Sequence, residues 1–352
     1  MRKTIKKRLK GGKILGKGAH GAAFNVGEIY GEPSFFSLIE KRTIEKIEIY
    51  SPESDGYQIH TAESDLTQFK EYIRIIPNRI AKVFLAARNI EKGFLEEIAI
   101  NRKISQIYGP LADSFLTIGP MPPPFRNEML GCIVTFDNSE KLYAVFNSKC
   151  NNHYDITDLL KFANDILDSI IILQTQSYEH NDIKLDNIVK CDDTYKLIDW
   201  GQATTVLNPE KKVGSLLSTS PIRWYILGHS HFNSKYRMQL RTTLRNVRFG
   251  TSQLFRTTFF RIVTEYNTVT EATPDRSTLE KKYRYTFDVF MLGMTMLHAV
   301  YKYRLSTETY MPIINKFTSL LDPVKNAIEA KEILRTHGQE EQQQQEKEQS
   351  AE

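Results

Sequence analysis

Hydrophobic positions change their spacing along the chain, and the spacing predicts the order of the elements. Short apolar or alternating runs predict strands within 14–31 and at Arg79–Leu85, Met129–Phe136, Lys141–Phe146, Asn187–Val189 and Tyr195–Ile198. Apolar residues at helical spacing predict helices over Gly93–Ile107, Tyr154–Ser177 and Phe287–Val300, and at least one more between Ile313 and Leu334. Because strands and one helix precede a mostly helical part, we expect an α+β chain with two lobes.

Polar, basic and low-complexity stretches set the expected domain boundaries. We expect a basic tail at 1–13, a first lobe at 14–146, a second lobe at 147–337 and a disordered, glutamine-rich tail at 338–352. Two segments are interpreted as insertions: a polar, proline-containing stretch at about 25–78 and a basic stretch at about 222–285. A length of 352 residues is sufficient for two lobes.

The composition argues against several classes of protein. The longest apolar stretch, Phe287–Val300, has 14 residues and contains Asp288, so it is too short to span a bilayer. No apolar segment of the kind found in a signal peptide follows the basic N-terminus. The three cysteines lack the paired spacing of a zinc site. Because it lacks a membrane-spanning stretch and a signal peptide, the chain is expected to be a soluble intracellular, cytoplasmic protein, with a mildly basic formal net charge of +5.

Two short segments combine carboxylates, a lysine and an amide at fixed spacing. They are His180-Asn181-Asp182-Ile183-Lys184-Leu185-Asp186-Asn187 and Ile198-Asp199-Trp200-Gly201. A loop carboxylate such as Asp182 can orient a hydroxyl and accept its proton, and Lys184 can neutralise charge on a moving phosphoryl group. Asn187 and Asp199 offer oxygen ligands to a divalent metal, and hard oxygen ligands suit Mg²⁺.

These segments resemble the catalytic loop, H-R-D-x-x-x-x-N, and the D-F-G motif of the eukaryotic-type protein kinase family. The resemblance implies a bilobal protein-kinase-like fold, with a small β-rich N-lobe containing one main helix and a larger, mostly helical C-lobe. It implies ATP-dependent transfer to serine or threonine hydroxyls, with Asp182 as the catalytic base and Asn187 and Asp199 as metal ligands. The implied cofactors are ATP and Mg²⁺, with Mn²⁺ as an alternative metal. Lys184 favours serine or threonine over tyrosine as the acceptor, because tyrosine kinases usually have Ala or Arg in this part of the loop.

A glycine-rich stretch near the N-terminus is a second candidate site. Gly16, Gly18 and Gly21 form a GxGxxG pattern, in which the missing side chains let backbone N–H groups approach phosphates. No βαβ pattern surrounds it, which argues against a dinucleotide-binding fold. The glycine-rich stretch lies upstream of a segment that resembles a kinase catalytic loop, and the resemblance implies that this stretch covers ATP.

The resemblance also assigns an ATP-binding lysine. Arg79–Val83 is similar to the lysine-bearing strand of the family, so Lys82 would bind the α and β phosphates. Glu97 would pair with this lysine from the following helix, with Glu96 as the alternative. Because the chain before Lys82 is longer than is usual in the family, Lys41 is a second candidate. The suitable distance to the helix that carries Glu97 favours Lys82.

Further matches lie downstream. Phe287–Gly293 resembles the buried helix whose Asp, here Asp288, braces the catalytic loop, and 320–334 resembles the last helical motif of the family. The resemblance therefore runs from about Gly16 to Leu334. With its insertions and its I-D-W-G motif, the chain also resembles the compact kinases that large DNA viruses encode. This second resemblance would place the protein in a host cell or a virion.

Three departures from the family pattern have consequences. Asn181 replaces the Arg that binds a phosphate on the activation loop, so we expect activity that is independent of activation-loop phosphorylation. The Ala-Pro-Glu motif is absent and Asn326 replaces the Arg that pairs with its Glu, so both halves of one buried ion pair are missing. Trp200 replaces the Phe of D-F-G and is expected to pack in its place.

The basic insertion bears on binding partners other than the protein substrate. Between Lys211 and Thr264 there are ten Lys or Arg and no acidic residue, with aromatic residues interleaved. We favour a basic face on helices that complete the second lobe, because aromatics at helical spacing usually belong to a core. The alternative is a docking surface at 211–261 for an acidic or nucleic-acid partner.

Two other functional classes stay open. Small-molecule kinases of the aminoglycoside or choline phosphotransferase type share H-x-D-x-x-x-x-N and often I-D-W. They usually lack a lysine two residues after the base and a clear glycine-rich loop, both of which are present here. A pseudokinase, which would be a non-catalytic binding module, is disfavoured by the complete set of Lys82, Asp182, Asn187 and Asp199.

Overall fold

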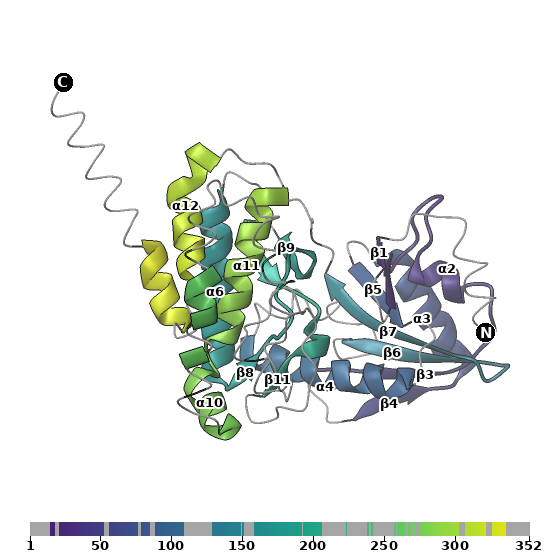
Figure 1. Cartoon of the computed structure of the whole chain (residues 1–352). Coiled ribbons are helices and arrows are strands. Elements are labelled where there is room, and N and C mark those ends of the chain that lie inside the picture. The colour runs from purple at the N-terminus through teal and green to yellow at the C-terminus, as the bar shows by residue number, and fades with distance from the viewer. Residues whose placement is uncertain are drawn as a thin grey trace. The chain divides into compact units, whose positions relative to one another are not determined.

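The structure, a computed structural model, forms two compact units, Met1–Cys150 and Asn151–Glu352 (Figure 1). The sequence analysis placed this boundary between 146 and 147. The structure describes residues 15–17, 21–52, 56–76, 79–84, 89–108, 129–148, 150, 158–191, 193–205, 223, 238, 241, 257, 259–264, 267–268, 271, 275–302, 307–321 and 326–335. The expected tails at 1–13 and 338–352 lie outside these ranges.

The first unit is built on one seven-stranded sheet in which all neighbouring strands are antiparallel. In sheet order the strands are β1 (Gly16–Lys17), β2 (Gly21–Asn25), β5 (Arg79–Phe84), β7 (Lys141–Ser148), β6 (Gly131–Phe136), β3 (Ile44–Tyr50) and β4 (Tyr57–His60). The strands predicted within 14–31 and at 79–85, 129–136 and 141–146 are confirmed, with small differences at their ends.

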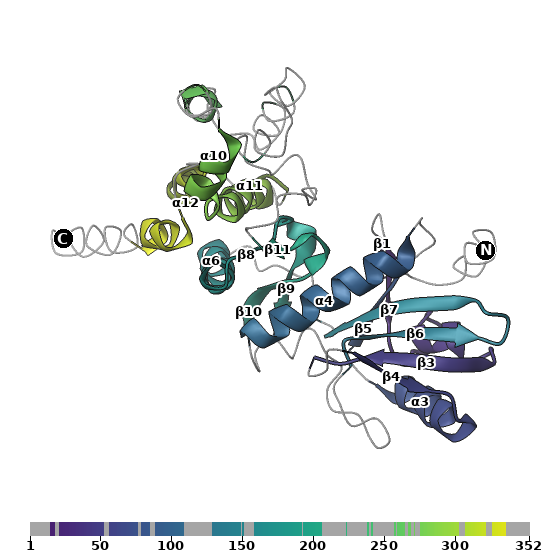
Figure 2. The same cartoon turned by 90° about the horizontal axis from the view of Figure 1, so that it is seen from below.

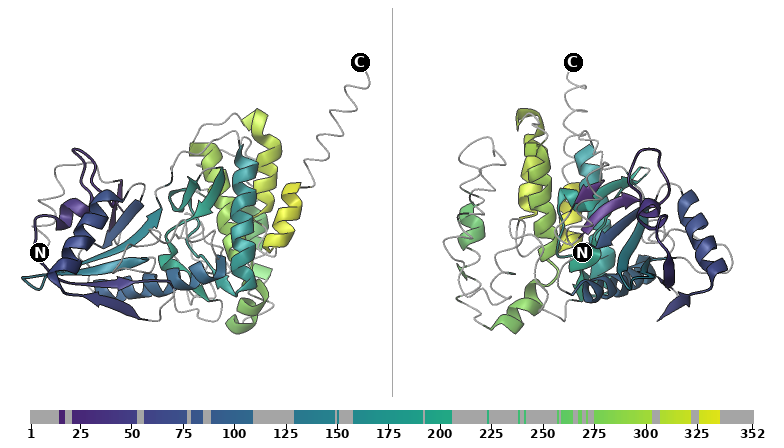
Figure 3. Two further views of the ribbon diagram at one scale, coloured as in Figure 1. Left: turned by 180° about the vertical axis from the view of Figure 1, so that it is seen from behind. Right: turned by 90° about the vertical axis from the view of Figure 1, so that its right-hand side faces the viewer.

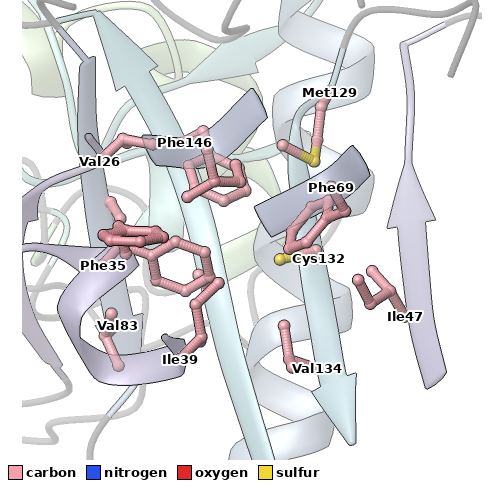
Figure 4. Packing of buried hydrophobic residues seen from close by; sticks show 14 of the residues in the cluster. Val26, Phe35, Ile39, Ile47, Phe69, Val83, Met129, Cys132, Val134 and Phe146 are labelled. Carbon is pink, nitrogen blue, oxygen red and sulfur yellow. The ribbon is translucent and has the colours of Figure 1, made fainter. Parts of the chain in front are cut away.

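One face of this sheet carries the main core of the unit. Successive side chains of a strand point to opposite faces, so Val83 and Phe146 lie on the same face as Ala81 and Ala144. Helices α2 (Phe35–Ile39) and α3 (Glu63–Ile75) cover this face and contribute buried residues to the same core. Figure 4 shows Phe35 beside Phe146, with ring centroids 5.2 Å apart in an edge-to-face arrangement.

The other face of the sheet packs against a single long helix. The same alternation turns Lys82, Phe84 and Tyr143 toward α4 (Ile90–Tyr108), which spans the helix predicted at 93–107. The ring of Phe94, on α4, lies 5.9 Å from that of Phe84 and 5.6 Å from that of Tyr143. Figure 2 shows α4 and α3 on opposite sides of the strands.

The segment at 25–78, interpreted from sequence as an insertion, is built into this unit. It forms α2, β3, β4 and α3, and β3 pairs with β6 in a register that places Ile47 opposite Val134. Phe35, Ile47 and Phe69 are fully buried. The polar character of the segment reflects its outer edge, because three of the four residues of β4 are exposed. The segment therefore belongs to the core as well as to the surface.

The described part of the second unit is mostly helical. Its helices are α6 (Leu159–Thr175), α10 (Arg276–Tyr283), α11 (Phe287–Lys302) and α12 (Thr307–Ser319), with a further helical stretch at 327–335. Helices α6, α11 and α12 lie side by side (Figure 1, Figure 3). Two small antiparallel pairs complete it, β9 (Ile188–Cys191) with β10 (Thr194–Leu197) and β8 (Tyr178–Glu179) with β11 (Thr204–Thr205). The chain is thus α+β, as predicted.

Helix α11 confirms the helix predicted at Phe287–Val300 and is buried on almost every side. From Phe287 to Val300 every residue except His298 is buried. Asp288 is buried within this apolar stretch, so it requires polar partners. Among the described residues, no helix is both long enough and apolar enough to cross a membrane.

Candidate active site

Two side chains of the 180–187 loop converge on the carboxylate of Asp182. Lys184 Nζ donates to Asp182 Oδ2 at 2.7 Å, and Asn187 Nδ2 donates to the same oxygen and to the Asp182 carbonyl at 2.8 Å each. The second oxygen, Oδ1, is buried and has no hydrogen-bond partner in the described part of the chain. A buried acceptor without a donor is unfavourable by about 1–3 kcal/mol, so this oxygen retains the capacity to accept one further hydrogen bond.

Helix α11 holds the backbone of the same loop. The Asp288 carboxylate accepts the backbone N–H of His180 at 2.7 Å and that of Asn181 at 3.0 Å. The bracing role expected for Asp288 is confirmed by these two contacts. Burial raises the pKa of Asp288, and the two N–H donors and His180 oppose this effect. Asn181 has a φ of 62°, a left-handed conformation that the bracing helps to maintain.

His180 connects this loop to the strand that leads to Asp199. Its Nε2 lies 3.1 Å from the Ile198 carbonyl, and its Nδ1 accepts the backbone N–H of Asp182 at 3.3 Å. These partners require a neutral ring with its proton on Nε2. Burial lowers the pKa of His180 and favours this neutral form. Trp200 is buried beside the ring, at 4.7 Å between centroids, so the aromatic replacement for Phe packs as expected.

The two predicted metal ligands, Asn187 and Asp199, flank the open end of the β9–β10 hairpin. Ile188 pairs with Leu197, and the Ile198 N–H donates to the Asn187 carbonyl at 2.9 Å. Because the amide nitrogen of Asn187 is used on Asp182, its amide oxygen is left to act as a ligand. One amide and one carboxylate suit Mg²⁺, which keeps several waters and binds substrate phosphates. Within the described ranges, no three or more His, Cys, Asp or Glu residues form a metal-binding group.

In the first unit, Lys82 and Glu97 form an ion pair. Lys82 Nζ lies 2.9 Å from both carboxylate oxygens of Glu97, and the glutamate side chain is only 7% exposed. Lys41, the other candidate lysine, is 84% exposed and lies 3.8 Å from the neighbouring Glu40. Glu96 is exposed on α4. The geometry therefore favours Lys82 and Glu97 as the pair that sequence analysis predicted.

The glycine-rich segment forms an antiparallel pair next to the strand of Lys82. Gly16 pairs with Ala23 across β1 and β2, and Ala23 pairs with Lys82 on β5. A side chain at Gly21 would place its Cβ 2.7 Å from the Val83 carbonyl oxygen, so the close approach of the two strands requires glycine there. Gly18 lies outside the described residues.

The second unit contains a buried ion pair that sequence analysis missed. Arg223, whose side chain is 2% exposed, lies 3.5 Å from Glu179 and 3.6 Å from Glu280. Glu179 immediately precedes the 180–187 loop, and burial raises its pKa to about 8 although Arg223 has the opposite effect. The ion pair that the resemblance would imply is absent from the sequence, and the pair described here joins residues that are far apart along the chain.

A scan of the chain against protein-family models found no match, and a search of curated proteins found none either. The assignment of function therefore depends on the sequence motifs and on the geometry described above.

The predicted site residues fall into two groups, one in each unit. Asp182, Lys184 and Asn187 come together in one loop, and Asp199 follows the paired hairpin. Lys82 and Glu97 come together in the first unit. The basic stretch at 211–261 lies largely outside the described residues, so a docking role for it stays a prediction.

Proposed function

We propose that this chain is an ATP-dependent protein kinase that transfers the γ-phosphate to serine or threonine hydroxyls of protein substrates. The observation that carries the proposal is the Asp182 carboxylate. One of its oxygens is fixed by Lys184 and Asn187, while the other has no partner among the described residues. The α+β architecture, with a β-rich first unit and a mostly helical second unit, is compatible with the bilobal kinase-like fold that the resemblance implies.

Asp182 would orient the acceptor hydroxyl through Oδ1 and take its proton as transfer proceeds. The hydroxyl oxygen forms a bond to the γ-phosphorus, the bond from this phosphorus to the β–γ bridging oxygen breaks, and ADP leaves. Lys184 would neutralise charge on the phosphoryl group. Its ammonium group donates to Asp182 Oδ2 at 2.7 Å, so it would lie beside the transferred phosphoryl group when the acceptor hydroxyl is bound to this carboxylate.

Lys82 would bind the α and β phosphates of ATP, with Glu97 orienting its ammonium group. Asn187 and Asp199 would hold the divalent metal, through the free amide oxygen of one and the carboxylate of the other. When bound, Mg²⁺ supplies neutralisation of the phosphate charge. Gly16, Gly18 and Gly21 would allow the backbone to approach the phosphates.

We also propose that activity is independent of activation-loop phosphorylation. Asn181 is buried, and its neutral amide donates to the Glu179 carbonyl at 3.5 Å. It offers no positive charge to a phosphate group. Phosphatase treatment of the purified protein is therefore expected to leave the rate of transfer unchanged.

The decisive experiment measures transfer from radiolabelled ATP with Mg²⁺ to a generic protein acceptor and to small-molecule acceptors side by side. Asp182→Asn should lower the rate by about 10²–10⁴-fold, because the amide cannot accept the proton. Asp186→Asn is the matched control, since Asp186 is an exposed carboxylate in the same loop and should retain the wild-type rate.

The outcomes separate the candidate functions. Labelled serine or threonine that depends on Asp182 supports the proposal. Transfer to small molecules alone would replace it with a small-molecule phosphotransferase. Nucleotide binding without any transfer would leave a pseudokinase, and equal rates for Asp182→Asn and wild type would remove Asp182 from the mechanism.

A further inference from the structure

We infer that the hairpin formed by β3 and β4 fixes the position of helix α4, and we call this hairpin the clamp. Arg102 is the positioning residue that attaches the helix to the hairpin. The inference rests on the proposed function, because the clamp would act through the Lys82–Glu97 pair. The hairpin comes from the 25–78 segment, which the sequence predicted to be an insertion.

Arg102 binds both ends of the connection between the two strands. Its Nε donates to the Ser51 carbonyl at 3.0 Å, and its Nη2 donates to the Gly56 carbonyl at 3.2 Å. Ser51 directly follows β3 and Gly56 directly precedes β4. Because a guanidinium group has its donors in a rigid plane, two bonds from it fix direction as well as distance.

A second contact between hairpin and helix is aromatic. The ring of Tyr50, the last residue of β3, lies edge-to-face on Phe94 with centroids 5.3 Å apart. Tyr50 also lies 5.0 Å from Tyr57, the first residue of β4, so both strands support the contact. Phe94 is fully buried. Glu97 lies between Phe94 and Arg102 along α4, and the clamp therefore holds the helix on both sides of it.

The N-terminal end of α4 has a separate support from strand β7. The Tyr143 hydroxyl donates to Glu91 at 3.2 Å, and the Lys141 ammonium group lies 3.9 Å from the same carboxylate. Loss of Arg102 would therefore remove a polar attachment in the C-terminal half of the helix, so that this half can tilt while the N-terminal end stays attached. A tilt of that kind would move Glu97 relative to Lys82.

The test compares Arg102→Ala and Arg102→Lys with Arg74→Ala as the matched control. Arg74 makes its ion pairs with Glu71 and Glu28 within the 25–78 segment. Arg102→Ala should lower kcat by about ten- to a hundredfold, because small misplacements of catalytic groups have large effects on rate. Arg102→Lys should recover part of the loss, and Arg74→Ala should match wild type in kcat and in KM for the acceptor.

A double-mutant cycle distinguishes positioning from a general structural role. If Arg102 acts through Glu97, the double variant R102A/E97Q should be no slower than E97Q alone. Multiplication of the two losses would overturn the inference.

Amide hydrogen exchange tests the clamp without reference to activity. In R102A, the amides of 97–105 should exchange faster than in wild type or in R74A. Unchanged exchange would overturn the clamp, whereas absence of transfer by the wild-type protein would overturn the proposed function and leave this measurement valid.

Discussion

At the scale of single residues, Glu179 and Asp182 are neighbouring buried carboxylates in different surroundings. Asp182 has one oxygen fixed by Lys184 and Asn187. Glu179 has no hydrogen bond to either oxygen within the described structure, and its carboxyl group lies 3.5 Å from the Arg223 guanidinium group. Asp288 and Glu280 add negative charge nearby, and together with burial they raise the pKa of Glu179 to about 8.

This raised pKa predicts a pH dependence of stability. Because folding raises the pKa from 4.5 to about 8, the stabilising contribution of protonated Glu179 is complete below about pH 4.5 and is lost as pH rises to about 8. Across this window the free energy of unfolding should fall by up to about 1.4 kcal/mol per pH unit from this group.

Glu179→Gln cannot ionise, so its unfolding free energy, measured by urea titration at several pH values, should lack this decline. Glu45→Gln, at an exposed position of β3, is the control and should keep the wild-type slope. A Glu179→Gln slope equal to that of wild type would contradict the assignment.

The proximity of three candidate site residues could be predicted because their spacing is local. Asp182, Lys184 and Asn187 lie within one loop, and their mutual contacts follow from that closeness. The contact between Arg223 and Glu179 could not be predicted from the sequence. The two residues are far apart along the chain, and no sequence motif links them. The orphan oxygen of Asp182 likewise depends on which donors the fold brings near.

At the scale of elements, helix α11 fixes the loop through one side chain. Asp288→Asn would turn an amide NH₂ toward one of two backbone N–H donors, so one of the two bonds would be lost. We expect the unfolding free energy to fall by about 1–3 kcal/mol. In a phosphate-transfer assay, kcat should fall by about ten- to a hundredfold.

Asp275→Asn is a suitable control, because Asp275 also accepts two backbone N–H groups, at the exposed N-terminus of α10. Asparagine caps helices about as well as aspartate, so this variant should keep both its stability and its rate. Wild-type kinetics for Asp288→Asn would show that the bracing has no part in catalysis.

Elements with a strong periodic pattern were predictable, and those whose pattern depends on distant partners were not. Helix α11 and strand β6 are both built mostly of apolar residues, because nearly all of their side chains are buried. Both elements could therefore be recognised from the sequence. Strand β3 is buried because it pairs with β6, more than eighty residues later. Strand β4 exposes three of its four residues, so it carries little hydrophobic signal.

At the scale of the whole molecule, nucleotide binding should raise the thermal stability of the protein. A ligand present at a hundred times its Kd stabilises the folded state by about 2.7 kcal/mol, which corresponds to a rise in Tm on the order of 5 °C. Lys82→Met should remove most of the rise produced by Mg²⁺ and ATP. Lys41→Met should keep it, since Lys41 is largely exposed.

Thermal melting of the three proteins with and without Mg²⁺ and ATP measures this effect. A rise that survives Lys82→Met and disappears in Lys41→Met would reverse the assignment of the ATP-binding lysine.

The position of β3 and β4 in the sheet has a consequence for the strand that carries Lys82. They are the last two strands at one edge, so β1, β2, β5, β7 and β6 remain neighbours in an unbroken order. A sheet that gains strands at its edge breaks none of its earlier pairings. The pairing of β5, which carries Lys82, with the glycine-rich β2 and with β7 is therefore independent of β3 and β4.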